Sequence, residues 1–336
     1  MAGQISKDRL HPAAVGWAER RPREERWGIA LSGGADSVAL LLLLWAHWPR
    51  RRPLLVAFHF DHRMRGAEST ADARFCAGLC RSLGIPLDAG RAAARRAGVT
   101  EAGARAARFA FIERAMGRRR MRVLWLGHQQ DDIAESLFMR LARGSGSGGL
   151  AAPRPVHALG SGSRLRQHVR PLLTLSKKEL TRVLRLAAAS WREDSSNATD
   201  AHFRNRLRRG VIPGWVTASQ RDALSGAARS RELLEEDDRA LERWTDLAGA
   251  LETDGTLVVS KLTGAERAVV RRSLHRWLLR QPEAGDLSRQ AFEVLLRAVE
   301  RGEPIRHSLG SNGFAVIRKG RLRFVSIGYR ADRTPH

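Results

Sequence analysis

The sequence is poor in cysteine and in long apolar runs, and each shortage excludes a class of protein. Its 336 residues include only two cysteines, Cys76 and Cys80, too few for a disulfide framework or a four-ligand zinc site. Their spacing places both on one helix face, where burial is expected. The longest apolar run is about half of a membrane span, and residues 1–28 lack the apolar core of a signal peptide. A soluble, cytoplasmic protein with no membrane contact is therefore predicted.

Lysine is also scarce, although the chain is strongly basic. Of 59 basic residues only five are lysines and 54 are arginines, and the formal net charge is +24. Such an excess suits a polyanion, because each neutralised phosphate releases counterions. A GC-rich coding sequence would give the same arginine-rich and alanine-rich composition without any ligand. The charge thus indicates a nucleic-acid partner, with compositional bias as the alternative.

Short apolar segments alternate with helical patterns over the first part of the chain. Strands are predicted at residues 27–31, 53–62 and 122–128, each followed by a helix. This order predicts an α/β fold with a doubly wound, mostly parallel sheet. Ligands of such sheets bind at the carboxyl ends of the strands. Three polar clusters occupy those ends and are expected to converge: residues 32–37, 59–65 and 128–132.

The hydrophobic pattern of the sequence changes after the α/β region. Amphipathic helical patterns replace the alternation beyond about residue 218, and an alternating segment around "RKGR" predicts a terminal β-hairpin. The expected organisation is a charged leader, a catalytic α/β domain, a smaller and mainly helical domain, and the hairpin as an extension of that second domain, with bounds 1–26, 27–215, 216–300 and 301–330.

The segment "SGGADS" joins the first predicted strand to an apolar helix. A Gly-Gly turn there lets backbone amides point at an anion, and the helix dipole adds to the attraction. The loop contains no lysine, which excludes a Walker A motif. A carboxylate, Asp36, suits a phosphate site only together with a divalent cation. The residues themselves predict nucleotide phosphates with Mg²⁺, and an ordinary strand–turn–helix corner is the alternative.

The same segment resembles the S-G-G-x-D-S signature of PP-loop, or N-type, ATP pyrophosphatases, whose fold is that of the adenine nucleotide alpha hydrolases. Further collinear segments resemble motifs of one member of that superfamily, the tRNA(Ile)-lysidine synthase family: "FHFDHRMRGAES", "ARAARF", "LGHQQDDIAESLFMRLARGSGSGGL", "RPLLTLSKKEL" and "WREDSSNATDAHFRNRLRRGVIP". The resemblance is dense from about residue 27 to 213 and looser beyond.

The resemblance implies a ligase that uses ATP and Mg²⁺ to modify tRNA. ATP adenylates the wobble cytidine of the CAU-anticodon isoleucine tRNA at its C2 oxygen and releases pyrophosphate. The amine of free L-lysine then displaces AMP, and the anticodon changes from reading AUG to reading AUA. The implied partners are this tRNA, ATP and L-lysine, with a homodimer as one option for assembly. Positioning and charge neutralisation would drive both steps.

Site residues carry over position by position. The ATP-binding residues would be Ser32, Gly33, Gly34, Ala35, Asp36, Ser37, His62 and Arg65, with Asp36 as the metal ligand. The catalytic residues would be Asp36, Arg108, His128, Asp132 and Glu135, of which Asp132 and Glu135 would bind lysine. The tRNA-binding residues would be Arg105, Asn197, Arg204, Asn205, Arg206 and Arg208. Simple helix capping at Asp131 and Asp132, and solvated helix faces for the arginines, are the alternatives.

Two other functions remain open. The first is a different PP-loop tRNA enzyme, such as a thiolase, but Cys76 and Cys80 are spaced C-x-x-x-C and not C-x-x-C. The second is a non-catalytic tRNA-binding relative, which would have lost acidic positions that this chain retains at Asp36, Asp132 and Glu135. Both are disfavoured against the ligase.

Overall fold

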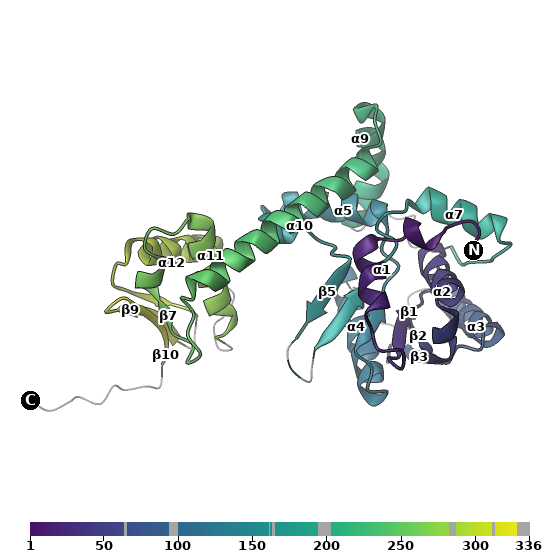
Figure 1. The fold of residues 1–336 in the computed structure, drawn as a ribbon, viewed down its shortest axis with the longest axis horizontal. Coiled ribbons are helices and arrows are strands. Elements are labelled where there is room, and N and C mark those ends of the chain that lie inside the picture. Colours follow the sequence, from purple (N-terminus) through teal and green to yellow (C-terminus); the bar gives the residue numbers. More distant parts are fainter. Residues whose placement is uncertain are drawn as a thin grey trace, which may run out of the picture. The chain divides into compact units, whose positions relative to one another are not determined.

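A computed structural model describes residues 1–63, 66–93, 100–160, 162, 165–193, 203–281, 287–310 and 313–327. The chain forms two compact units, Met1–Glu235 and a second from Glu236 onward. Their boundary falls inside helix α10 (Ala223–Ala248), later in the chain than the predicted boundary after residue 215. Figure 1 shows the elements of both units.

The first unit is built on a six-stranded sheet with the order β3–β2–β1–β4–β6–β5. Five strands are parallel, and β5 pairs with β6 antiparallel at one edge. The predicted doubly wound, mostly parallel sheet is therefore confirmed. The strands are β1 (Trp27–Ala30), β2 (Leu55–Asp61), β3 (Leu87–Arg91), β4 (Val123–Trp125), β5 (Val156–Leu159) and β6 (Arg166–Val169).

Both faces of the sheet are buried, which explains why its central strands are continuously apolar. Successive residues of a strand point to opposite faces, so Ala57 packs in one core and Phe58 in the other. The first face is covered by α1 (Pro12–Glu19), α2 (Ala35–His47), α3 (Ala67–Ser82) and α7 (Lys177–Leu186). Helix α4 (Glu101–Arg118) covers the second face.

Helix α2 is the most apolar of these helices because it lies inside the first core. Eight of its 13 residues are buried, so its leucine run packs against the sheet and holds the loop that precedes it. Within the described ranges, no helix combines the length and the hydropathy needed to cross a membrane.

The predicted charged leader packs against the same core. Ile5 and Leu10 flank a short 3-10 helix (Lys7–Arg9), and α1 carries Ala14 and Ala18; all four residues are at most 2% exposed. The backbone N–H of His11 donates to the Pro171 carbonyl at 2.8 Å. The sequence did not reveal this because the apolar residues of the segment form only short runs beside charged residues, so no long apolar run marks it.

A small helical layer completes the first unit. It contains α5 (Gln130–Leu141), α6 (Ser147–Leu150), α8 (Phe203–Arg206), a π-helical turn (Leu207–Val211) and α9 (Ile212–Ser219). Ile133 and Ala134 of α5 share a core with Leu207, Ile212 and Ala227. This packing holds the segment "FRNRLRR" against the helix that begins with the acidic cluster.

The second unit combines helices with an antiparallel sheet of order β7–β10–β9–β8. Its elements after α10 are β7 (Leu257–Val258), a 3-10 turn (Val259–Leu262), α11 (Arg267–Leu279), α12 (Arg289–Arg301), β8 (Ile305–Ser308), β9 (Gly313–Arg318) and β10 (Arg321–Ser326). The predicted hairpin is β9–β10. It forms the centre of the four-stranded sheet, because β7 and β8 pair with its outer edges.

The packing of the leader predicts a large loss of stability on truncating one of its side chains. Leu10→Ala removes a leucine that is 1% exposed and should lower the free energy of unfolding by about 2–5 kcal/mol. The matched control, Leu186→Ala, truncates a leucine that is 58% exposed and should change it by less than about 0.5 kcal/mol. Urea denaturation measures both, and equal effects would contradict the packing of the leader.

Candidate active site

The loop between β1 and α2 is closed by its own serine hydroxyls. The backbone N–H groups of Ser32 and Gly34 donate to Ser37 Oγ at 3.2 Å and to Ser32 Oγ at 3.3 Å. Ser37 Oγ donates to the Gly34 carbonyl at 2.9 Å. Helix α2 begins at Ala35, with Gly34 as its N-cap. The turn is therefore preorganised at the positive end of a helix dipole, where an anion is stabilised.

Gly33 has a backbone conformation that disfavours a side chain. Its φ is +93°, and a Cβ there would lie 3.2 Å from the sulfur of Cys76 on α3. The Gly33 carbonyl accepts a hydrogen bond from the Arg192 backbone N–H at 2.8 Å, and the Arg192 side chain donates to Asp72 on α3 at 2.8 Å. The loop is thereby held to both α3 and the chain after α7.

The loop lies at the point where the strand order of the sheet reverses. Strands β2 and β3 follow β1 on one side, and β4 lies on its other side, so a crevice is expected beyond β1 and β4. Gly127, just after β4, meets the loop here. A Cβ at Gly127 would lie 2.9 Å from the Asp36 carbonyl oxygen. Only a hydrogen fits, and this brings the cluster after β4 against the first turn of α2.

Asp36 is the acidic group at this junction. Burial and then the nearby Asp132 carboxylate raise its pKa to about 6, while Lys177 and Arg208 act in the opposite direction. Its Oδ1 atom is buried and has no hydrogen-bond partner among the described residues. A buried carboxylate oxygen without a partner is a suitable ligand for Mg²⁺. The described residues contain no group of three metal-ligating side chains.

The two carboxylate oxygens of Asp132 have different hydrogen-bond partners. Its Oδ2 accepts from the Gln129 backbone N–H at 3.0 Å and forms a capping box at the start of α5. Its Oδ1 accepts from Arg204 Nη2. Asp131 Oδ2 accepts from the Lys177 backbone N–H at 3.0 Å. Helix capping at Asp132 is thus real, and one oxygen remains for charge pairing.

Glu135 lies one turn further along α5 and is 1% exposed. Its Oε2 accepts from Arg204 Nε and its Oε1 from Arg208 Nε, both at 2.5 Å. The predicted lysine-binding carboxylates are therefore paired with two of the predicted tRNA-binding arginines. A buried carboxylate needs such partners, because an unpaired buried charge is strongly destabilising.

The remaining predicted residues fall into three groups. Arg105 and Arg108 on α4 lie over the ring of Phe109, with guanidinium carbons 4.9 and 5.6 Å from its centre, and both lower the pKa of His128. His62 packs edge-on against Phe60 after β2, Asn205 is half-buried on α8, and the exposed Arg206 lies over Phe203. Arg65 and Asn197 lie outside the described residues.

The structure adds two basic residues to the site that the sequence did not predict. Lys177, the first residue of α7, is close enough to lower the pKa of Asp36. Arg170 follows β6, is 7% exposed and donates to His128. The signal for Arg170 was its place in "RPLL", directly after a strand. That strand, "RQHV", was not predicted because it is short and mostly polar.

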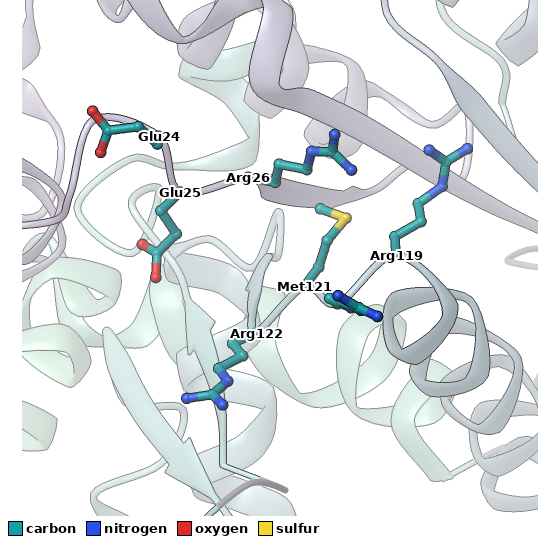
Figure 2. A pocket seen from close by; sticks show the side chains of 7 residues that line it. Glu24, Glu25, Arg26, Arg119, Met121 and Arg122 are labelled. Carbon is teal, nitrogen blue, oxygen red and sulfur yellow. The ribbon is translucent and has the colours of Figure 1, made fainter.

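One described cavity lies elsewhere. It measures ≈ 350 Å³ and is lined by Glu24, Glu25, Arg26 and residues 119–122, just before β1 and β4 begin. Figure 2 shows its charged side chains pointing in different directions and not converging on one point. It lies at the amino ends of the strands, opposite the edge where the polar clusters meet, so we do not assign it as the active site.

The contact at Gly127 predicts that a single methyl group will separate the two sides of the site. Gly127→Ala should lower the free energy of unfolding by roughly 1–3 kcal/mol, because the new Cβ would overlap the Asp36 backbone. In Gly117→Ala, the matched control within α4, the Cβ meets nothing within 4 Å and improves helix propensity. Chemical denaturation of both variants measures the difference, and an unchanged Gly127→Ala would refute the close approach.

The raised pKa of Asp36 predicts a stability that falls as pH rises. Below about pH 4 this carboxyl is protonated in both folded and unfolded states. Between pH 4 and about 6 the unfolded state loses its proton first, so ionisation penalises folding, and the penalty is complete above pH 6. Without metal, Asp36→Asn should therefore be more stable than the parent at pH 7, by up to about 3 kcal/mol, and nearly equal at pH 4.

The control for this experiment is an aspartate with the opposite shift. A hydrogen bond from Arg119 lowers the pKa of Asp88, so the stabilisation by its charge is complete above about pH 4, and the stability difference between Asp88→Asn and the parent should stay constant from pH 4 to 8. Thermal unfolding from pH 4 to 8 follows both variants. A pH-independent difference for Asp36→Asn would contradict the assigned environment.

Curated proteins are similar in sequence to this chain over long stretches. Curated relatives named tRNA(Ile)-lysidine synthase include one from Geobacter sulfurreducens, 35% identical over 280 residues, covering 80% of this chain and 57% of the relative. Another, from Symbiobacterium thermophilum, is 36% identical over 271 residues, covering 74% and 55%. A third, from Nitratidesulfovibrio vulgaris, is 42% identical over 193 residues, covering 55% and 53%. The chain spans about half the length of the curated relatives it matches.

The fold also matches a solved structure. The U34-tRNA thiolase NcsA from Methanococcus maripaludis superposes with a TM-score of 0.53 at 16% identity, covering 66% of this chain and 77% of that one, which supports the fold alone. The family described as the PP-loop domain matches residues 10–215. That range exceeds half of the chain and contains the loop, the strand ends and the acidic helix start, so the chain belongs to the PP-loop domain family.

Proposed function

We propose that this protein is a tRNA(Ile)-lysidine synthase, which joins free L-lysine to C2 of the wobble cytidine of the CAU-anticodon isoleucine tRNA at the expense of ATP. The proposal is carried by one observation: three carboxylates, Asp36, Asp132 and Glu135, gather at the carboxyl edge of the sheet beside a loop shaped for phosphate. The names of the curated relatives support it.

ATP would bind across the loop after β1. The amides at residues 33–35 and the N-terminus of α2 would receive the phosphates, and Asp36 would hold Mg²⁺ through its unpartnered Oδ1. When bound, the ion would neutralise charge on the phosphates and lower the pKa of Asp36. Lys177 would supply the cationic side chain that the loop itself lacks. His62 and Arg65 stay predicted ATP contacts.

The proposed reaction has two displacement steps. In the first, the C2 oxygen of the cytidine attacks the α phosphorus of ATP, an O–P bond forms, and pyrophosphate leaves. In the second, the neutral ε-amine of lysine attacks C2, a C–N bond forms, and AMP departs with the electron pair of the C2–O bond. Arg108 would neutralise the phosphoryl group, and the chemistry depends on positioning rather than on a protein nucleophile.

Asp132 and Glu135 would bind the lysine ammonium and help to remove its proton. Because Arg204 and Arg208 already pair with these carboxylates, the ammonium would compete with the guanidinium groups for the same oxygens. The tRNA backbone offers these arginines alternative partners, since arginine forks bind phosphate well. We therefore propose that tRNA binding draws the arginines away and opens the carboxylates. Arg105, Asn197, Asn205 and Arg206 stay predicted tRNA contacts.

The second unit would contribute to tRNA binding by contacting the charged phosphate backbone of the tRNA. Recognition of RNA rests largely on its shape and on unstacked bases. The wobble base has to leave its stack to reach the site. A homodimer stays a prediction, for which analytical ultracentrifugation is the measurement.

Sulfur transfer, the main alternative chemistry, is disfavoured by the state of the thiols. Burial raises the pKa of Cys76 to about 12 and that of Cys80 to about 11. The reactive form of a cysteine is the thiolate, which such pKa values suppress at neutral pH. A purely binding role is disfavoured because all three carboxylates are present and brought together.

Labelled lysine tests the proposal directly. The protein is incubated with ATP, Mg²⁺, ¹⁴C-lysine and a CAU-anticodon isoleucine tRNA, and the label should appear in the tRNA. Asp36→Asn should abolish pyrophosphate release, whereas Glu135→Gln should release pyrophosphate but incorporate at least about tenfold less lysine. No label, with an active lysidine synthase run beside it as positive control, would refute the function.

The design also separates the roles of the carboxylates. Equal loss of pyrophosphate release and lysine incorporation in Glu135→Gln would argue against a lysine-binding role for Glu135. Circular dichroism of each variant excludes unfolding as the cause. Glu113→Gln, an exposed glutamate on the same sheet-covering helix as Arg108, is the control for a neutralised carboxylate outside the site and should keep both steps.

A further inference from the structure

Arg170 and His128 come from neighbouring parallel strands and meet at the edge of the candidate site. Strands β4 and β6 are paired, with Trp125 beside Val169. Arg170 follows Val169 directly, and His128 lies three residues after Trp125. The close contact at Gly127 places this end of β4 against the phosphate loop. Arg170 is therefore one of the basic residues of the candidate site, and none of the roles assigned above involves it.

The contact between these two side chains determines where the imidazole proton lies. Arg170 Nε donates to His128 Nδ1 at 3.1 Å, and Arg170 Nη1 donates to the Arg154 carbonyl at 2.8 Å. A guanidinium has only donors and is charged at all ordinary pH values. His128 Nδ1 must accept, so it carries no proton. The remaining proton of a neutral imidazole is then on Nε2.

The charges around His128 act in the same direction. Burial lowers its pKa well below the usual value, and the positive charges of Arg170, Arg105, Arg204 and Arg108 lower it further. These arginines come from the end of β6, from α4 and from α8. Burial and then Arg105 lower the pKa of Arg170 to about 10, with Asp132 of α5 acting in the opposite direction, so Arg170 stays charged at neutral pH. A second proton on His128 is thus disfavoured at neutral pH.

We propose that Arg170 is a positioning residue that holds His128 as the Nε2–H tautomer, so that His128 serves as a hydrogen-bond donor to an anionic oxygen of the substrate and not as a general base. A base would need a free ring nitrogen, and the guanidinium occupies that nitrogen. The donor role rests on the proposed function, because an anionic phosphoryl oxygen is the acceptor expected in this crevice. The tautomer assignment stands on the protein alone.

Nuclear magnetic resonance tests the tautomer without any substrate. In the full-length protein with ¹⁵N-labelled histidine, His128 is assigned by comparison with His128→Asn. At pH 7 the ring should show the coupling pattern of the Nε2–H form. Arg170→Met, which fills similar space without a donor, should shift it toward the Nδ1–H form. Arg170→Lys, which keeps a donor, should restore much of the parent pattern.

Two results would overturn the assignment. One is a parent His128 that is protonated on Nδ1 or on both nitrogens at pH 7. The other is an Arg170→Met protein that keeps the parent pattern, which would make the guanidinium irrelevant to the tautomer. The parent spectrum is decisive even when Arg170→Met does not fold, because it needs no variant at Arg170.

A pair of amide substitutions tests the donor role. The side-chain nitrogen of glutamine can take the place of Nε2, whereas that of asparagine corresponds to Nδ1. His128→Gln should therefore release pyrophosphate from ATP at least about tenfold faster than His128→Asn. Equal rates for the two variants would refute the donor role. If the parent protein releases none, the proposed function fails, and the spectroscopic result still decides the tautomer.

Discussion

The close approach of Gly127 to the Asp36 backbone is the contact on which the site depends. It joins the end of β4 to the first turn of α2 across the point where the strand order reverses. With a side chain at that position, the phosphate loop and the acidic start of α5 would be held apart. Buried sheet faces exist in many α/β proteins, but this one backbone contact joins two neighbouring strand ends into a single candidate site.

Around that contact lies a group of negatively charged side chains in a protein whose net charge is positive. The chain carries a net charge of +24, yet carboxylates gather at the carboxyl edge of its sheet, where burial and then the Asp132 carboxylate raise the pKa of Asp36 to about 6. Arginines surround this acidic centre and satisfy the deepest carboxylate, Glu135. The same side chains that suit a polyanion thus also stabilise the buried carboxylates.

The sequence predicted the sheet, the turn between the first strand and its helix, and the convergence of the strand ends, because their signals are local: apolar strands, a Gly-Gly turn and a motif of fixed spacing. It missed the packing of the leader, whose apolar residues form only short runs beside charged ones. It also missed Arg170, which follows β6, and Lys177, which begins α7, because only the packing of these elements brings the two residues to the site. The pairing of Glu135 with Arg204 and Arg208 was not predictable, since it joins residues about 70 positions apart.

The ion pairs of Glu135 have a consequence for any measurement of affinity. Arg204 and Arg208 are attached to the protein, so they compete for the carboxylates at an effective concentration that is in the millimolar range for short flexible connections and higher for a packed helix. A free amine that binds there is measured against this tethered competitor. Its apparent dissociation constant in the isolated protein therefore reflects an exchange between two cations. Once another anion binds the arginines, this dissociation constant falls, although the amine gains no new contact.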